Sequence, residues 1–454
     1  MKMLFSGIMC VCLATNAAAQ QETHVTDSIA TEWERQLQLD EVVIVAQRPV
    51  IKQQEGKLIY LVKNDPYCAG LDGMSLLDRI PRVSVENGSV KVAGKGNVRY
   101  IIDGILMELD NDAMMTRLRA IQAENIEKIE MLATPPSRYA AEPNAVYLSI
   151  TTKDETLGTR GSVYGSLSKG DKFSEYLSGS INHTTRRIEM SFDANMWDYK
   201  GVNDLTADYR FDNYSRLSET RTDIHNFNAG FNTMFRYKFS GTMNAGVIVN
   251  YKYDNTSSRR DNHTDYSAYT SSSHSTATEK PVNAINLTAF YDWKFGHNGE
   301  LLQLTYNLFR KHNPSNSTVS TLYDAPDLPE IGITENGAID YTFHSGKADF
   351  KLPYKWAEIE TGIAYTDIRN KSTLDVRNYS NHLPAAGYDI SNDFDYSEQI
   401  GAIYLSAARK LWGNFHGKLG LRYEYTWTKS FLRSNGQSDK DNYGKLFPTL
   451  NISW

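Results

Sequence analysis

The chain has 454 residues, of which 48 are Lys or Arg and 54 are Asp or Glu, and its net charge is −6. This length fits about two or three domains. No run of about 18–20 apolar residues occurs, so we expect no helix to span a membrane, and a membrane location would require strands. The charge is small for the length and is spread along the chain, which argues against nucleic acid as a partner.

The N-terminus has the pattern of a secretory signal. Lys2 precedes an apolar stretch at 3–14, which is followed by small residues up to Ala19. This order predicts a signal peptide at residues 1–19, with cleavage after Ala19. Its removal would leave Cys68 as the one cysteine, and one cysteine makes no intramolecular disulfide.

Residues 20–56 are predicted to form a flexible lead, because Glu, Thr and Gln dominate its first half and offer too little apolar surface to fold alone. The lead contains a short β-branched run, 42–45, before Pro49. Such a run is either a core strand or a segment that pairs with the sheet edge of another protein. The residues alone favour the core strand.

Between residues 57 and 155 the signals change every few residues, as in a small α+β domain. The turn pair Asn87-Gly88 suits a tight hairpin, and Asp103-Gly104 ends a strand. The expected strands are 57–62, 83–85, 90–92, 98–102, 126–131 and 145–151, and the expected helices are 74–80 and 110–121.

From about Gly158 onwards apolar and polar residues alternate, which is typical of strands that bury one side only. The links between these strands are predicted to be short near Thr185, Gly241, 296–299, Pro353 and Gly413, and long at 199–223, 256–280, 311–338, 371–393 and 429–445. Tight turns at one rim and long loops at the other are typical of outer-membrane barrels. We therefore expect a transmembrane β-barrel at residues 156–454.

Four stretches between residues 77 and 142 resemble the plug of TonB-dependent outer-membrane receptors, most closely the Bacteroidota-type outer-membrane β-barrel family. They are Leu77–Val85, Gly94–Gly104 with Gly94, Gly96, Asp103 and Gly104, Asn125–Glu130, and Pro136–Glu142 with Arg138 and Tyr139. The resemblance implies an α+β plug domain followed by an antiparallel transmembrane β-barrel in the bacterial outer membrane. The chain departs from the family pattern at Ala93, Pro143 and Val146, where we expect the edge of the plug to be built differently.

The resemblance also changes the interpretation of the β-branched run. The family carries its energy-coupling segment just before the plug, which implies that Val42, Val43, Ile44, Val45 and Ala46 form a TonB box. TonB, the periplasmic partner, would capture this segment by strand addition. The other implied partners are outer-membrane lipid, an extracellular ligand bound by the long loops, and a surface lipoprotein; no cofactor is implied.

The number of strands raises a question about completeness. We expect about twelve strands in the barrel region, whereas barrels that enclose a plug have about 22. The chain is then a truncated receptor, a small barrel with its plug outside, or one of several associating copies, and we favour truncation. The last strand ends on the aromatic residue Trp454, as outer-membrane barrels often do.

No catalytic or metal-binding motif occurs, and we expect no enzymatic activity. Several charged residues on the inward faces of strands fit a wet barrel lumen better than acid-base pairs: Glu189, Asp193, Arg236, Lys238, Lys418, Arg422 and Glu424. The leading hypothesis is a TonB-dependent receptor that imports its ligand. The alternatives are a binding or adhesion barrel without transport and, less favoured, an outer-membrane hydrolase.

Overall fold

The computed structural model describes residues 49–453 apart from 55–56, 69, 87–88, 108–110, 122, 133–136, 140–143, 154–156, 268–269, 279–280, 326, 382, 385–389 and 414. All of these residues belong to one compact unit, Pro49–Trp454. The predicted signal peptide (1–19), the TonB box (Val42–Ala46) and Trp454 lie outside the described residues.

The N-terminal part is built on a six-stranded sheet in the order β1-β2-β7-β8-β5-β6. Its strands are β1 (Ile51–Gln54), β2 (Lys57–Tyr60), β5 (Val98–Ile102), β6 (Ile105–Met107), β7 (Ile126–Leu132) and β8 (Val146–Thr152). β5 and β8 pair in parallel, and the other neighbours pair antiparallel. The sheet begins at Ile51, inside the segment predicted as a flexible lead.

Two helices and a hairpin complete this plug domain: α1 (Gly73–Leu77), α2 (Asn111–Ala120), β3 (Val83–Glu86) and β4 (Ser89–Val92), with 3-10 turns η1 (Val62–Asn64) and η2 (Ala123–Asn125). The carboxylate of Asp72 caps α1 by accepting from the Ser75 N–H at 2.7 Å. Leu76, Leu77 and Leu118 are fully buried between the helices and the sheet. The predicted helices and hairpin are therefore confirmed, and no described helix has the length and apolarity to cross a membrane.

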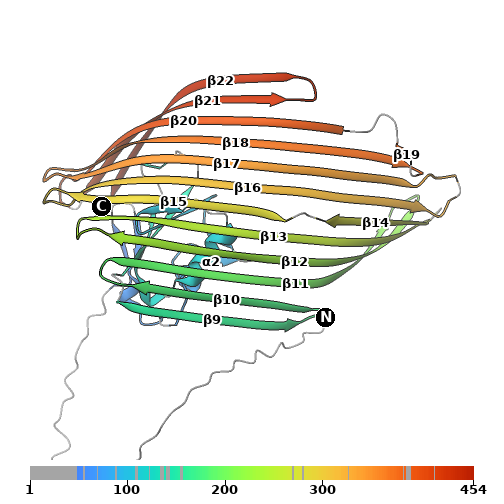
Figure 1. Cartoon of the computed structure of the whole chain (residues 1–454), viewed down its shortest axis with the longest axis horizontal. Coiled ribbons are helices and arrows are strands. Elements are labelled where there is room, and N and C mark those ends of the chain that lie inside the picture. The colour runs from blue at the N-terminus through green and yellow to red at the C-terminus, as the bar shows by residue number, and fades with distance from the viewer. Residues whose placement is uncertain are drawn as a thin grey trace, which may run out of the picture. The chain divides into compact units, whose positions relative to one another are not determined.

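The C-terminal part forms one antiparallel sheet of 14 strands, whose order follows the chain from β9 to β22 (Figure 1). β14 and β15 both lie between β13 and β16, so they occupy one position and the sheet has twelve positions apart from the short β19. The strands are β9 (Gly158–Lys169), β10 (Phe173–Thr184), β11 (Ile188–Arg210), β12 (Ser215–Lys238), β13 (Met243–Tyr266), β14 (Thr270–Thr278), β15 (Val282–Phe295), β16 (Glu300–Tyr323), β17 (Ile331–Pro353), β18 (Glu358–Ser380), β19 (Leu383–Pro384), β20 (Ile390–Lys410), β21 (His416–Leu432) and β22 (Gln437–Ser453).

The prediction of long loops between these strands was wrong. β11 and β12 continue through the predicted loop at 199–223 and turn only at Phe211–Tyr214, where the Phe211 N–H donates to the Tyr214 carbonyl at 2.9 Å. The chain here carries Ser, Thr, Asp and Arg on both faces, so hydropathy stops alternating while the backbone pairing continues in register. The short links near Thr185 and Gly241 are confirmed as turns.

The two faces of the large sheet differ in polarity. On β11 the side chain of Phe192 is 46% exposed, whereas its neighbour Asp193 is 5% exposed. The apolar face continues around the sheet in Phe231, Phe235, Leu304, Ile363, Leu405, Leu421 and Ile452, all of which are exposed. Polar groups on the opposite face are buried, among them Asn232, Asn250, Asn307, Ser406 and Arg422. This polarity suits strands that meet lipid on one side and a polar interior on the other.

The plug contacts the polar face, which decides one of the alternatives left open by the sequence. Arg117 of α2 pairs with Asp193 on that face, and β9 and β22 stand at the two ends of the strand order without pairing to each other in the described part of the chain. A small closed barrel with the plug outside is therefore wrong for this structure.

A buried carboxylate ties the start of the plug together. Asp65 accepts hydrogen bonds from the Tyr60 hydroxyl, from the Tyr67 N–H at 2.9 Å and from Arg79 Nε at 3.1 Å. Burial acts to raise the pKa of Asp65, but these donors hold the pKa below the ordinary value of 3.8. Burial and the hydrogen bond to Asp65 raise the pKa of Tyr60 to about 12. Cys68 is buried beside this cluster, and its thiol donates to the Asp65 carbonyl at 3.0 Å.

We predict that Asp65→Asn increases the rate at which a thiol reagent labels Cys68 by about tenfold or more, because three donors lose a charged acceptor. Acidification through the lowered pKa of Asp65 should weaken the same cluster, since the stability from a carboxylate whose pKa is depressed on folding is lost as the pH falls through that pKa. Thermal unfolding of the chain measures this effect, because thiol labelling itself slows when the thiolate is protonated. Mass spectrometry of the labelled chain measures the rate. Glu86→Gln is the control, because Glu86 forms an exposed pair with Lys91, and equal rates in both variants would contradict the prediction.

Candidate functional site: the contact between plug and barrel wall

The first contact between the plug and the wall is a buried ion pair. Arg117 on α2 reaches Asp193 on β11 with Nη1 and Oδ2 3.2 Å apart, and the two side chains are 12% and 6% exposed. Asn232 on β12 donates to the same carboxylate oxygen at 3.1 Å. Because both charges are removed from water, each depends on the other for its stability.

The second contact lies 20 residues later in the plug, at Ser137. The hydroxyls of Ser137 and Thr449, from β22, are 3.0 Å apart, and the Ser137 carbonyl accepts from Arg422 Nη1 at 3.4 Å. Arg422 Nε in turn donates to Glu424 at 2.6 Å. A Cβ at Gly420 would collide with the Ser137 side chain, so the absence of a side chain at Gly420 allows the plug to approach β21.

Arg138 and Tyr139 extend this second contact. The Tyr139 ring is buried and stacks on Tyr147 with centroids 4.7 Å apart, while Lys347 of β17 places its Nζ 4.7 Å from the same centroid. Burial raises the pKa of Tyr139 to about 12, although the cation of Arg138 opposes this rise. For Arg138 itself, burial acts to lower the pKa, and the neighbouring Tyr139 and the wall carboxylates Glu360 and Asp349 outweigh burial and raise it. The wall carboxylates therefore stabilise the buried Arg138 cation.

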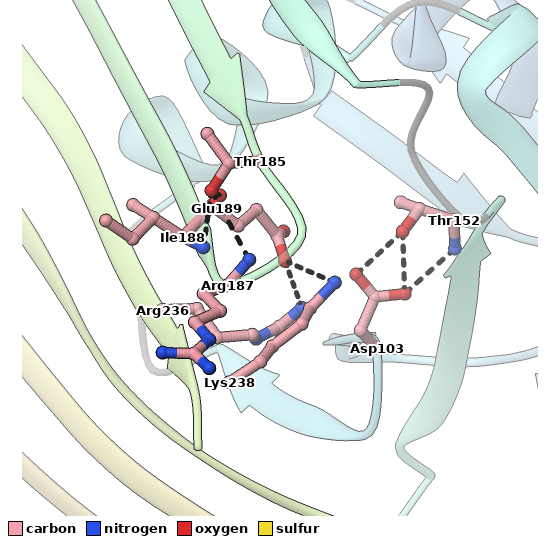
Figure 2. Close-up of polar contacts among 8 residues, drawn as sticks. All are labelled: Asp103, Thr152, Thr185, Arg187, Ile188, Glu189, Arg236 and Lys238. Atoms are coloured by element: carbon pink, nitrogen blue, oxygen red, sulfur yellow. Dashed lines mark hydrogen bonds and ion pairs between the residues drawn. The ribbon is translucent and has the colours of Figure 1, made fainter. Parts of the chain in front are cut away.

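A small cavity of about 180 Å³ separates the plug from β9–β12. On the plug side, the Asp103 carboxylate accepts from the Thr152 N–H at 2.8 Å and from its hydroxyl (Figure 2). On the wall side, Glu189 pairs with Arg236 at 2.8 Å and lies 4.0 Å from Lys238. The cavity is thus bordered by carboxylates that are partnered within the plug, as Asp103 is, and within the wall, as Glu189 is.

Apolar contact between the two parts is limited. Met234, Ile248 and Phe290, on β12, β13 and β15, are the wall residues that join the buried apolar cluster of the plug. The rest of that cluster comes from the plug itself. The plug therefore has a core of its own and touches the wall mainly through polar groups.

The structure places the predicted plug motif residues in three separate places. Gly94 has a φ of +74°, and the Gly96 N–H donates to the Asn144 carbonyl at 3.0 Å, so both residues shape a turn within the plug. Asp103 and Gly104 have φ values of 48° and 84° and form the two-residue turn between β5 and β6.

Not all of the predicted plug motif residues meet the wall. Arg138 and Tyr139 meet the wall, as described above. A Cβ on Gly104 would lie 3.6 Å from Gln303 Nε2 on β16, which leaves only ordinary contact distance at that turn. The TonB box and Trp454 are outside the described residues.

Sequence reasoning missed Arg117, Lys347 and Gly420, and it included Ser137 only as part of the motif stretch 136–142. The wall partners Asp193 and Arg422 were among the inward charges predicted from alternation, but alternation does not identify the plug residue that meets each of them. In the sequence alone, an arginine near the end of a polar helix resembles a solvent-exposed residue, because nothing there shows that the wall lies against it. No group of His, Cys, Asp and Glu side chains in the described part of the chain forms a metal site.

Residues 293–454 match the model of a family described as "Outer membrane protein beta-barrel family". This region is similar to outer-membrane β-barrels. The match places the chain in the outer membrane and confirms the predicted location, and the family is one of barrels and not of enzymes, as expected. No curated protein matches the chain.

Several solved structures resemble the chain. The unliganded ferric citrate transporter FecA matches at 11% identity and a TM-score of 0.44, over 88% of this chain and 60% of FecA. The ferric yersiniabactin uptake receptor FyuA from Yersinia pestis matches at 10% identity and a TM-score of 0.32, over 87% of this chain and 79% of FyuA. The RagAB peptide importer in its "closed-closed" state matches at 8% identity and 0.30, over 84% and 74%. The chain thus spans 60% of the length of FecA.

We predict that Arg117→Met loosens the plug from the wall, because it leaves the Asp193 carboxylate buried without its cation, at a cost of about 3–5 kcal/mol. Hydrogen exchange of α2 in the intact chain should become faster. The double variant Arg117→Met/Asp193→Leu should return the exchange rate towards that of the parent, since neither charge is then stranded.

The matched control is Lys172→Met, which breaks an ion pair between Lys172 and Asp223 that is 43% and 35% exposed. Exposed pairs contribute little, so its exchange rate should match the parent. Equal exchange at α2 in Arg117→Met and Lys172→Met would show that the ion pair does not hold the plug.

Proposed function

We propose that the chain functions as an outer-membrane receptor of the TonB-dependent type. In this function the far ends of the long hairpins bind a ligand outside the cell, the plug occludes the lumen, and TonB draws on the segment at 42–46 to move the plug. The observation that carries the proposal is the nature of the contact between the plug and the wall, which is mainly polar although the plug has a complete apolar core.

Polar contacts suit a plug that must leave its position against the wall and return to it. When the Ser137–Thr449 hydrogen bond opens, water replaces each partner at little net cost, because the net contribution of such a bond is about 1 kcal/mol. The Arg117–Asp193 pair is stronger but regains hydration in the same way. A plug held by a continuous apolar interface would instead expose that interface to water each time it moved.

The course of the chain supports coupling at the N-terminal end. The proposed TonB box precedes β1 by only four residues, 47–50, and β1 is the edge strand of the plug sheet. The Val50 carbonyl accepts from the Leu61 N–H at 2.7 Å, and the Pro49 carbonyl accepts from Asn64 Nδ2 at 2.9 Å. A pull on residues 42–46 would therefore act first on β1 and on these two hydrogen bonds.

The coupling segment is testable without knowledge of the ligand. We predict that Ile44→Pro abolishes binding of the purified periplasmic domain of TonB to the chain in detergent, because proline removes a backbone donor needed for strand addition. Deleting residues 39–46 should have the same effect. Binding is measured by surface plasmon resonance with the TonB domain immobilised.

The control replaces Thr31, upstream of the proposed box, with proline, which should leave TonB binding at the level of the parent. Unchanged binding in Ile44→Pro and in the deletion would reject capture of this segment by TonB.

Movement of the plug relative to the wall is tested by a covalent lock. The hydroxyls of Ser137 and Thr449 are 3.0 Å apart, so we predict that Ser137→Cys/Thr449→Cys forms a disulfide on mild oxidation. In single-molecule pulling on the N-terminus of the chain in a bilayer, the parent should release the whole plug before any wall strand. The oxidised variant should release only the residues before 137, and reduction should restore the full extension. Simultaneous extraction of the plug and wall strands in the parent would contradict the proposal.

A binding or adhesion barrel without transport is the second candidate. It is favoured by the length of the hairpins, since β12, β13 and β16 have 24 residues each whereas about 9–11 suffice to cross a bilayer. The excess forms a large surface beyond the membrane. Binding of a ligand to this surface by a chain that fails to bind TonB would select this function.

A further inference from the structure

The ends of β11–β14 and β16 that lie farthest from the plug line a second, larger and open cavity of about 420 Å³, a size typical of ligand sites. Tyr209, at its edge, is 16 residues beyond Asp193 on the continuous strand β11, which corresponds to about 50 Å. The even separation places Tyr209 on the same face of β11 as Asp193. The cavity therefore opens on the polar face of the sheet, at the end opposite to the plug contact.

Three strands place one cation between two aromatic rings. Tyr209 on β11 lies opposite Arg216 on β12, and Arg216 lies opposite Tyr266 on β13. The Arg216 guanidinium carbon is 4.3 Å from the centroid of the Tyr209 ring. Tyr323, on β16, lines the same cavity one row nearer the plug. Stacking on tyrosine holds the guanidinium plane in position while leaving its outer N–H groups to a ligand.

Arg216 is not neutralised by the protein. No carboxylate lies among the residues that line this cavity, and no ion pair of Arg216 exists in the described part of the chain. Its Nε is buried and makes no hydrogen bond there. By contrast, Arg210 in the same hairpin forms an ion pair with Asp208 at 2.8 Å on the opposite face. A lone guanidinium in a neutral cavity favours one anionic group of a ligand.

The floor of the cavity is a fixed set of hydroxyl groups. Asn262 donates to Ser218 Oγ and to Thr220 Oγ1, both at 2.7 Å, and accepts from Thr264 Oγ1 at 2.7 Å. Each hydroxyl has one donor and two acceptor positions, so the network keeps the capacity to bind further hydroxyls. Fixed hydroxyls beside the faces of tyrosine rings suit a ring that is apolar on its face and hydroxylated at its edge, as in a sugar.

We propose that this cavity is the binding site for an acidic saccharide, that is, a sugar bearing one carboxylate or sulfate on each bound unit. Arg216 binds the anionic group, the tyrosines pack against the sugar ring, and the Asn262 network binds its hydroxyls. A nucleotide fits less well, because one guanidinium has no second cation beside it to balance a phosphate dianion. The inference rests on the proposed receptor function, for which it names the class of ligand.

Isothermal titration calorimetry of the intact chain in detergent tests the site with digalacturonate, 3′-sulfolactose, lactose and AMP as probes. We expect at least one of the two acidic saccharides to bind, and Arg216→Gln to weaken its binding by about tenfold. Arg216→Lys should lose less, because the charge remains. Tyr209→Ala should weaken binding of the acidic saccharide as well. Binding of digalacturonate alone or of sulfolactose alone identifies the anionic group as a carboxylate or a sulfate.

Arg210→Gln is the matched control and should bind like the parent, since Arg210 lies on the other face of the same hairpin. The proposal is overturned if lactose binds as tightly as its sulfated form, if Arg210→Gln and Arg216→Gln lose equally, if AMP binds best, or if no saccharide binds. Failure here with TonB capture intact rejects only the ligand class, whereas saccharide binding without TonB capture rejects only the energy coupling.

Discussion

The structure depends on the difference between the two faces of each strand after residue 158. One face must meet lipid, so its side chains are apolar, as Phe192 and Phe231 are on β11 and β12. Backbone pairing along the strands satisfies the N–H and C=O groups that lipid cannot. The other face is then free to carry charged and amide groups, and Asp193, Asn232 and Arg422 on that face meet the plug or support the residues that do.

The character of the plug contact follows from this division. A wall that is polar inside offers the plug ion pairs and hydrogen bonds, and among the described residues of the wall Met234, Ile248 and Phe290 are those that join the buried apolar cluster of the plug. The plug consequently requires its own core, which its six-stranded sheet and two helices supply. Buried ion pairs such as Arg117–Asp193 add little net stability compared with apolar packing. They do specify one position of the plug against the wall, because a displaced plug leaves Asp193 without its cation.

Sequence reasoning succeeded where local patterns determine local structure. The turn pair Asp103-Gly104 marked the end of β5, and the strand at 98–102 agrees with the structure. It failed in the hairpin ends, because an alternation criterion requires one apolar face and β12 carries polar residues on both faces around Arg221. Pairing with neighbouring strands extends β11 and β12 to Phe211–Tyr214. The sequence of a single segment does not show this pairing.

The plug–wall site was predictable only in part for a related reason. Alternation identified the inward charges of the wall, including Asp193, and the motif identified Arg138 and Tyr139. The partners of these residues depend on contacts across long separations, such as the 312 residues between Ser137 and Thr449. Such contacts follow from the placement of the plug against the sheet, and they leave no spacing signal in the sequence.

In this structure the apolar face of the large sheet meets lipid, and the opposite face meets the plug. Nitroxide labels attached through Phe192→Cys and Ser191→Cys, each in a Cys68→Ala background in bilayers, test this claim by power saturation with oxygen and with a water-soluble nickel complex. The account predicts that the label at 192 is reached mainly by oxygen dissolved in lipid and that the label at 191 is shielded from both relaxants by the plug. Labels at both positions reached mainly by the nickel complex would show that neither face meets lipid, and would contradict the account.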